Sequence, residues 1–245
     1  MGETGEVINV SENKVPQPIG EVVIGLQDPR QLSAQNFHNN PEILYHGSAE
    51  PINFSPNYDY EMKIVPHSSK AGAGFYTTPD KEDARLFSIA WGAQEGKEVV
   101  TSFLPYQAKM YDFRNRADIG SNAPVPRELF DEYRHFIINT FTAKYPAVPS
   151  GYDPYYRSFK EYRSKLNELY FAGKPIDLRQ MLSLTGETAH SEFGALHINK
   201  FMRQKGFDGL IYLEGGDHRN HRIPASYLFF NLHKLGTYES WHKIT

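Results

Sequence analysis

The chain contains no cysteine in its 245 residues. This absence excludes disulfide bonds, zinc sites built from thiolates and catalysis by a cysteine nucleophile. It also fits a protein that works in a reducing compartment such as the cytosol. There is no run of 18 apolar residues, so the sequence predicts no membrane-spanning helix. The N-terminus is polar and acidic and lacks the basic and apolar regions of a secretory signal, so we expect no signal peptide.

The chain also lacks an excess of positive charge. Its 26 lysines and arginines stand against 29 acidic residues, the net charge is -3, and the cations are spread along the chain. Phosphate backbones are bound by clustered lysine and arginine side chains. The composition therefore argues against a nucleic acid as the main partner.

Two common cofactor signatures are missing as well. The chain has no Walker-type loop, and Gly72 and Gly74 are followed neither by a third glycine nor by a ribose-binding acid, which argues against a dehydrogenase. His218 and His221 lie three residues apart without a matched carboxylate, so we expect no metal site there. The basic segment 218–222 is better suited to contact the phosphates of a nucleotide or a substrate.

Aromatic side chains are plentiful, with 16 tyrosines, 16 phenylalanines and an aromatic share of 14%. Such side chains bury large areas, and tyrosine adds a polar tip, so they either pack a sheet or line a binding cleft. The length of the chain suits one domain with an insertion.

The hydrophobic patterns predict an α+β domain over residues 41–245. Residues 1–40 are polar and carry three prolines, so we expect an N-terminal arm that is loosely ordered or lies over the surface. Residues from about 115 to 185 differ in character and predict a helical insertion, with helices at 126–143 and 155–171.

Elsewhere in the domain, short apolar runs predict strands and two further helices. A helix is expected to begin at Pro79-Asp80, and another is expected over 192–205 with Gly206 as its C-terminal stop. The predicted strands are 42–46, 75–78, 99–104, 108–113, 207–213 and 226–232. The third and fourth of these are expected to be neighbours in a meander.

Two segments carry the side chains best suited to a nucleotide. The first is an apolar run that ends at His46-Gly47-Ser48, and the second is a glycine-rich approach to Phe75-Tyr76-Thr77-Thr78. They place an imidazole, a hydroxyl and a phenol at the ends of two predicted strands, which suits a ribose and a flat heteroaromatic ring. The alternatives are a structural role for His46 and core packing for Tyr76.

In this order and spacing, the segments resemble the motifs of mono-ADP-ribosyltransferases of the His-Tyr-Glu type, the diphtheria-toxin and poly(ADP-ribose) polymerase class. Leu44–Ser48 is similar to the first motif. Gly74–Thr78 is similar to the second, with Phe87 as the second aromatic residue eleven positions after Tyr76. Gly206–Tyr212 and Ser226–Asn231 are similar to the closing strands. These blocks cover about a third of the chain, and bacterial effectors, toxins and phage-encoded members are the most similar in character.

The resemblance implies a split, mixed β-sheet that binds NAD+ as a co-substrate in the cleft between its halves. His46 is expected to hydrogen-bond the adenosine-side ribose, and Gly47 is expected to bind the nicotinamide amide with support from Ser48. Tyr76 and Phe87 are expected to sandwich the nicotinamide ring. The second motif also places Gly74 in this cofactor-binding set.

The third catalytic position departs from the family pattern. The glutamate that usually opens the last strand is replaced by Ser226, which could instead contact a ribose or end a strand. The nearest acids are Glu214 and Asp217, after the preceding strand. We expect Glu214 to be the catalytic acid, together with His46 and Tyr76, and Asp217 is the second candidate.

The expected activity is transfer of ADP-ribose to a protein acceptor with release of nicotinamide, in the cytoplasm or in the cytosol of a target cell into which a toxin or effector is delivered. One alternative is an NAD+ glycohydrolase, in which water replaces the acceptor. Another is a catalytically silent module that binds NAD+ or ADP-ribose, which the serine at position 226 suggests. A phosphotransferase acting on 2′-phosphorylated RNA is disfavoured because basic residues are few.

Overall fold

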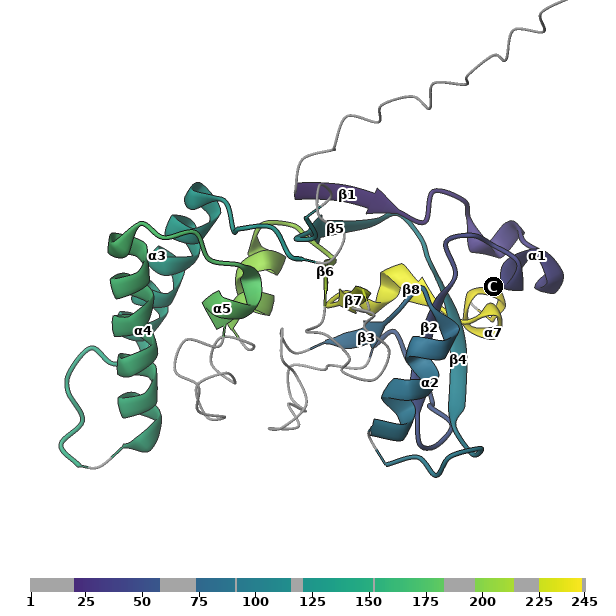
Figure 1. The fold of residues 1–245 in the computed structure, drawn as a ribbon, viewed down its shortest axis with the longest axis horizontal. Helices are drawn as coiled ribbons and strands as arrows, with labels where there is room; N and C mark the ends of the chain where they lie inside the picture. Colours follow the sequence, from purple (N-terminus) through teal and green to yellow (C-terminus); the bar gives the residue numbers. More distant parts are fainter. Residues whose placement is uncertain are drawn as a thin grey trace, which may run out of the picture.

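The computed structural model describes residues 20–57, 74–90, 92–115, 121–151, 153–182, 197–213 and 225–243. The chain forms an α+β protein with a mixed five-stranded sheet, a three-stranded antiparallel sheet and helices. In Figure 1 the larger sheet lies in the middle, with α3 and α4 on one side of it and α2, β2 and β4 on the other.

The larger sheet has the order β1-β5-β6-β7-β3. Its β5–β6 pair is parallel and its other pairs are antiparallel. Its strands are β1 (Gly20–Ile24), β3 (Phe75–Thr77), β5 (Ala108–Asp112), β6 (Gly209–Leu213) and β7 (Ala225–Phe229).

The smaller sheet has the order β2-β4-β8. Its strands are β2 (Leu44–Ser48), β4 (Val99–Pro105) and β8 (Leu235–Gly236). The two sheets meet where Tyr45 of β2 and Thr78, directly after β3, form an isolated bridge. The bridge makes β2 and β3 the neighbouring strands at the junction of the sheets.

The expectation that residues 99–104 and 108–113 pair in a meander is wrong. The corresponding strands β4 and β5 belong to different sheets, although only two residues separate them. Gln107 has a positive φ of 46° in this connection, and its N–H bonds the carbonyl oxygen of Gly25 at 2.8 Å. The tight turn therefore directs the chain from one sheet to the other.

Residues 20–40, which the sequence assigns to the N-terminal arm, contain three regular elements. Gly20–Ile24 pair with β5 as the edge strand β1. A 3-10 helix, η1 (Pro29–Gln31), and a short helix, α1 (Ala34–His38), follow it. The side chains of Asp28 and Ser33 accept hydrogen bonds from the first turns of these helices, which are the N-caps that define their starts.

The helices expected at 126–143 and 155–171 are confirmed as α3 (Arg127–Lys144) and α4 (Pro154–Ala172). The side chain of Asp153 caps α4, and Gly173 ends it in the left-handed conformation with φ 69°. The short α5 (Leu178–Leu182) and a helix that includes residues 197–204 complete this region. Gly206, with φ 81°, ends that last helix as expected.

The helical region shares one hydrophobic core with the larger sheet. Tyr133, Ile137 and Leu166 of α3 and α4 belong to the same buried cluster as Tyr212 and Leu228 of the sheet. The opposite face of the sheet packs against the smaller sheet through a second cluster. The larger sheet is thus covered on both faces.

Three short elements complete the described part, namely α2 (Lys81–Ala90), η3 (Leu232–Lys234) and α7 (Tyr238–His242). The α2 helix packs on β2 and β4. Its start agrees with the sequence, since the carboxylate of Asp80 accepts hydrogen bonds from the N–H groups of Glu82 and Asp83. None of the helices in the described ranges is both long and apolar enough to cross a membrane.

Candidate functional site

The site begins where β2 and β3 separate. Tyr45 and Thr78 exchange two backbone hydrogen bonds, of 2.7 and 2.9 Å. In an antiparallel ladder, the next pair to bond in this way would be Gly47 and Tyr76. That pair does not form a bridge, so the strands diverge after a single bridge.

The side chain of His46 takes the place of the missing ladder bond. Its Nδ1 lies 2.7 Å from the carbonyl oxygen of Tyr76. Its ring stacks on that of Phe75, with centroids 4.4 Å apart and planes inclined by 24°. Because a carbonyl oxygen can only accept, Nδ1 carries the proton, and the Nε2 of the neutral ring is left with a lone pair that can accept a hydrogen bond.

The protonation state of His46 follows from its surroundings. Burial lowers the pKa of the His46 imidazole below its usual value, while the hydrogen bond to the Tyr76 carbonyl acts in the opposite direction. Burial is the larger effect. The ring is therefore neutral at pH 7, with the proton on Nδ1.

Gly47 is required by the approach of α2. A Cβ at this position would collide with the carbonyl oxygen of Ala84. One turn further along α2, the buried hydroxyl of Ser88 donates to the carbonyl oxygen of Ser48 at 2.8 Å. These contacts hold β2 against the helix.

The backbone of Gly47 faces the separation between the strands. Tyr45 directs its N–H and C=O at Thr78, and backbone groups two residues apart on a strand point the same way. Among the described residues, no hydrogen bond to the N–H or C=O of Gly47 is formed on this side. The peptide therefore offers a donor and an acceptor side by side.

Ser48 and Gly74 occupy the ends of the two motif strands. The Ser48 hydroxyl donates to the carbonyl oxygen of Glu50 at 2.6 Å, so it stabilises the turn that follows β2. A Cβ on Gly74 would lie 2.6 Å from a Leu228 methyl carbon and 2.7 Å from the carbonyl oxygen of Phe229. Gly74 thus permits the close packing of β3 on β7.

Tyr76 and Ser226 come from neighbouring strands. Tyr76 pairs with Leu228 across β3 and β7, and Ser226 precedes Leu228 by two residues, so the three side chains share one face of the sheet. Tyr76 is half-buried against the core under the helices, whereas Ser226 is only 2% exposed. Phe75 packs in the other cluster, so the Tyr76 phenol and the His46 imidazole lie on opposite faces of β3.

Phe87 lies on α2 and is half-buried. It makes no aromatic ring contact with any residue that the structure describes. The expected sandwich of a nicotinamide ring between Phe87 and Tyr76 stays a prediction.

The expected acids lie outside the described residues. Both Glu214 and Asp217 fall in the segment 214–224, as does the basic segment 218–222. The residue before Glu214 is held firmly, because the Asn122 side chain accepts from the Leu213 N–H at 2.7 Å and donates to its carbonyl oxygen at 2.9 Å. No sequence pattern indicates this clamp, since Asn122 stands alone in a polar stretch between predicted elements.

The sequence also does not indicate a second polar cluster, which consists of Asp112, Arg114 and Tyr227. Asp112 is fully buried and receives a two-point hydrogen bond from the guanidinium of Arg114, at 2.9 and 2.8 Å. The same guanidinium lies 5.7 Å from the centre of the Tyr227 ring. Arg85, by contrast, is occupied by ion pairs of 2.7 Å with Glu82 and Glu98.

Within the described ranges, no group of three or more histidine and acidic side chains could hold a metal ion. Comparison of the chain with protein-family models, with curated proteins and with solved structures gives no match. The interpretation of the site therefore depends on its residues and their geometry.

Proposed function

We propose that this chain is an NAD+-dependent mono-ADP-ribosyltransferase with the split-sheet fold of the His-Tyr-Glu type. The observation that carries the proposal is the hydrogen bond of 2.7 Å from His46 Nδ1 to the Tyr76 carbonyl. It joins the two motif segments at the point where the sheets separate. It brings the side chain of His46 to the backbone of Tyr76, whereas the Tyr76 phenol lies on the opposite face of β3.

His46 and Gly47 bind the two ends of NAD+ in this proposal. The Nε2 lone pair of His46 accepts a hydrogen bond from a hydroxyl of the adenosine-side ribose. The N–H and C=O of Gly47 form a pair of hydrogen bonds with the carboxamide of nicotinamide, which itself carries one acceptor and two donor hydrogens. A fixed tautomer and a rigid peptide suit these tasks because neither group has to reorganise on binding.

Aromatic rings hold the leaving group. Tyr76 stacks on the nicotinamide ring from β3, and Phe87 approaches from α2. Each such contact contributes about 0.5–1.5 kcal/mol. Ser48 supports the carboxamide site, Gly74 keeps β3 close to β7, and the hydroxyl of Ser226 lies on the Tyr76 face of the sheet.

The chemical step breaks the bond between ribose C1′ and the nicotinamide nitrogen, and the bonding electron pair leaves with nicotinamide. The acceptor then attacks C1′ and loses its proton. A carboxylate stabilises the positive charge that develops on the ribose, as in glycosidases. Glu214 is the proposed acid because it directly follows Leu213, whose backbone is clamped by Asn122.

The test is release of nicotinamide and transfer of label from NAD+ labelled in its adenine part. The full chain is incubated with the labelled NAD+ in the presence and absence of a cell lysate. We expect nicotinamide release by the parent chain, label on a lysate protein, and loss of both in His46→Ala. A parent chain that neither binds NAD+ nor releases nicotinamide contradicts the proposal.

Two alternatives remain distinct outcomes of the same experiment. Free ADP-ribose without labelled protein identifies an NAD+ glycohydrolase. Binding of NAD+ without nicotinamide release identifies a silent module, which the burial of Ser226 in the usual glutamate position favours.

A further inference from the structure

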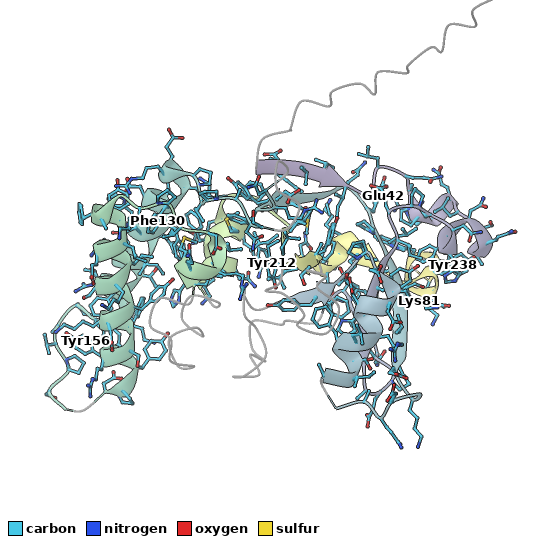
Figure 2. All side chains as sticks on the ribbon, viewed as in Figure 1. Glu42, Lys81, Phe130, Tyr156, Tyr212 and Tyr238 are labelled. Atoms are coloured by element: carbon cyan, nitrogen blue, oxygen red, sulfur yellow. The ribbon has the colours of Figure 1, made fainter. Side chains whose placement is uncertain are left out.

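The hairpin of α3 and α4 carries an unusual surface at its tip. We define the tip patch as Lys144, Tyr145, Tyr156, Arg157, Lys160 and Arg163. In Figure 2 the labelled Tyr156 lies near the tip and Phe130 lies toward the opposite end of the hairpin. The tip is thus well separated from Tyr212, which is labelled in the larger sheet.

The patch is positively charged in a chain that is negative overall. Residues 144–163, which span the patch, contain four lysines and arginines and two acids, which gives +2, whereas the whole chain carries -3. The rest of the chain therefore carries -5. Of the two acids, Asp153 is engaged in capping α4 through a hydrogen bond of 3.0 Å from the Tyr156 N–H.

The cations of the patch are not neutralised by ion pairs with the residues that the structure describes. Within the described part of the chain, Lys144, Arg157, Lys160 and Arg163 form no ion pair, whereas Lys165 nearby pairs with Glu168. Arg157, Lys160 and Arg163 are spaced three residues apart, so they follow one side of α4. Their charges are available to a partner.

Aromatic rings hold two of these cations in place. The Lys144 ammonium lies 3.5 Å from the centre of the Tyr155 ring, and the Arg163 guanidinium lies 4.3 Å from that of Phe141. The Tyr145 and Tyr156 rings meet edge to face at 5.0 Å. Tyrosine and arginine on a preorganised surface are the residue types that dominate the centres of protein interfaces.

We propose that the tip patch docks an acidic segment of a protein partner, which under the proposed function is the ADP-ribose acceptor. The partner supplies aspartate or glutamate side chains that pair with the four cations. This inference rests on the proposed function only for the identity of the partner as the acceptor, and the binding itself does not depend on NAD+.

Other polyanions fit the surface less well. Outside residues 144–163 the chain carries a net charge of -5, so an extended nucleic acid that reaches beyond the patch meets no overall excess of cations. A membrane surface calls for an apolar face next to the cations. The tip offers Val148, at 76% exposure, as its one exposed large hydrophobic side chain among the described residues.

The test measures binding of the full chain to fluorescent poly-L-glutamate, with a short DNA duplex and phosphatidylserine vesicles as competing probes. We expect saturable binding to poly-L-glutamate that weakens at least tenfold when Lys144, Arg157, Lys160 and Arg163 are all replaced by Glu. A second variant with Gln at the same four positions removes the charges without adding acids, and circular dichroism checks that both variants fold.

A matched control variant replaces four exposed lysines outside the patch by Glu and changes the net charge by the same amount. These are Lys81, Lys97, Lys200 and Lys243. We expect this control to bind poly-L-glutamate like the parent chain. Equal weakening in both sets shows a general charge effect and overturns the proposal. Preferential binding of the DNA or the vesicles overturns it as well.

The experiments distinguish a failure of the docking proposal from a failure of the proposed enzymatic function. The tip variants should release nicotinamide from NAD+ at the parent rate while they label less acceptor protein in a lysate. If the parent chain releases no nicotinamide but still binds poly-L-glutamate through the patch, the docking surface stands and the enzymatic function falls.

Discussion

His46 and Tyr76, thirty positions apart in the chain, are joined by a side-chain to backbone hydrogen bond of 2.7 Å. The bond replaces the next rung of a β-ladder and holds two strands at a fixed separation. It also determines which nitrogen of the imidazole carries the proton. One contact thus defines both the shape and the hydrogen-bonding character of the site.

The first prediction concerns pH. The folded-state pKa of His46 is lowered from the ordinary value of 6.5, so the unfolded chain binds this proton more readily than the folded one. The His46 contribution to the free energy of unfolding is fully present above pH 6.5 and is lost as the pH falls toward the folded-state pKa. Urea denaturation should show that the free energy of unfolding falls more between pH 7.5 and pH 5.5 for the parent chain than for His46→Gln. An equal loss contradicts the assignment.

The second prediction concerns the contact between β2 and α2. Replacement of Gly47 by Ala forces a methyl group against the Ala84 carbonyl and should lower the free energy of unfolding by about 1–3 kcal/mol, or more if the backbone cannot shift. Gly151→Ala is the control, since no atom lies within 4 Å of a Cβ built there. Denaturant titration of both variants checks the prediction, which is wrong if they unfold at the same midpoint.

The third prediction concerns the clamp on β6. Asn122→Ala leaves the N–H and C=O of Leu213 without their side-chain partner and should cost about 1–3 kcal/mol in the free energy of unfolding. Asn122→Asp keeps the acceptor but loses the donor and brings a carboxylate close to the Leu213 carbonyl, so it should not restore stability. Unchanged denaturation of the alanine variant would show that the clamp is dispensable.

The fourth prediction ranks the two candidate acids under the proposed function. Glu214→Gln should reduce nicotinamide release by about 10²–10³-fold, because it removes the charge that stabilises the ribose cation. Asp217→Asn should change the rate much less. The reverse pattern assigns the role of catalytic acid to Asp217. Unchanged rates in both variants show that neither Glu214 nor Asp217 is the catalytic acid.

The two long helices were predictable because their signals are local. The apolar spacing of Leu129, Tyr133 and Ile137 marks the buried side of α3, and Asp153 with Pro154 marks the start of α4. Such signals depend on neighbouring residues along the chain. They do not depend on which part of the fold the helix will cover.

Strand partners were not predictable in the same way. Short apolar runs identify β4 and β5 as strands, but they do not say which strands these pair with, and the turn at Gln107 sends them to different sheets. The edge strand β1 was missed because Gly20–Ile24 is short and follows a polar, proline-containing stretch. Its pairing with β5 supplies the hydrogen bonds that stabilise it.

The residues of the candidate site also differ in whether local sequence signals can identify them. His46, Gly47 and Tyr76 could be named from motifs, because their residue types and spacing are carried by short segments. Asn122 could not, because its role comes from an approach to Leu213 across 91 positions of the chain. The structure also puts the His46 and Tyr76 rings on opposite faces of β3, which no motif indicates.

The core shared by the helices and the larger sheet limits how this chain can be shortened. Removal of residues 121–182 would expose Leu210, Tyr212 and Leu228, which are now fully buried beneath the helices. The sheet is therefore not expected to survive as a separate minimal fragment. Changes of length at residues 146–151, in contrast, leave that shared interior intact and can alter the choice of partner without rebuilding the rest.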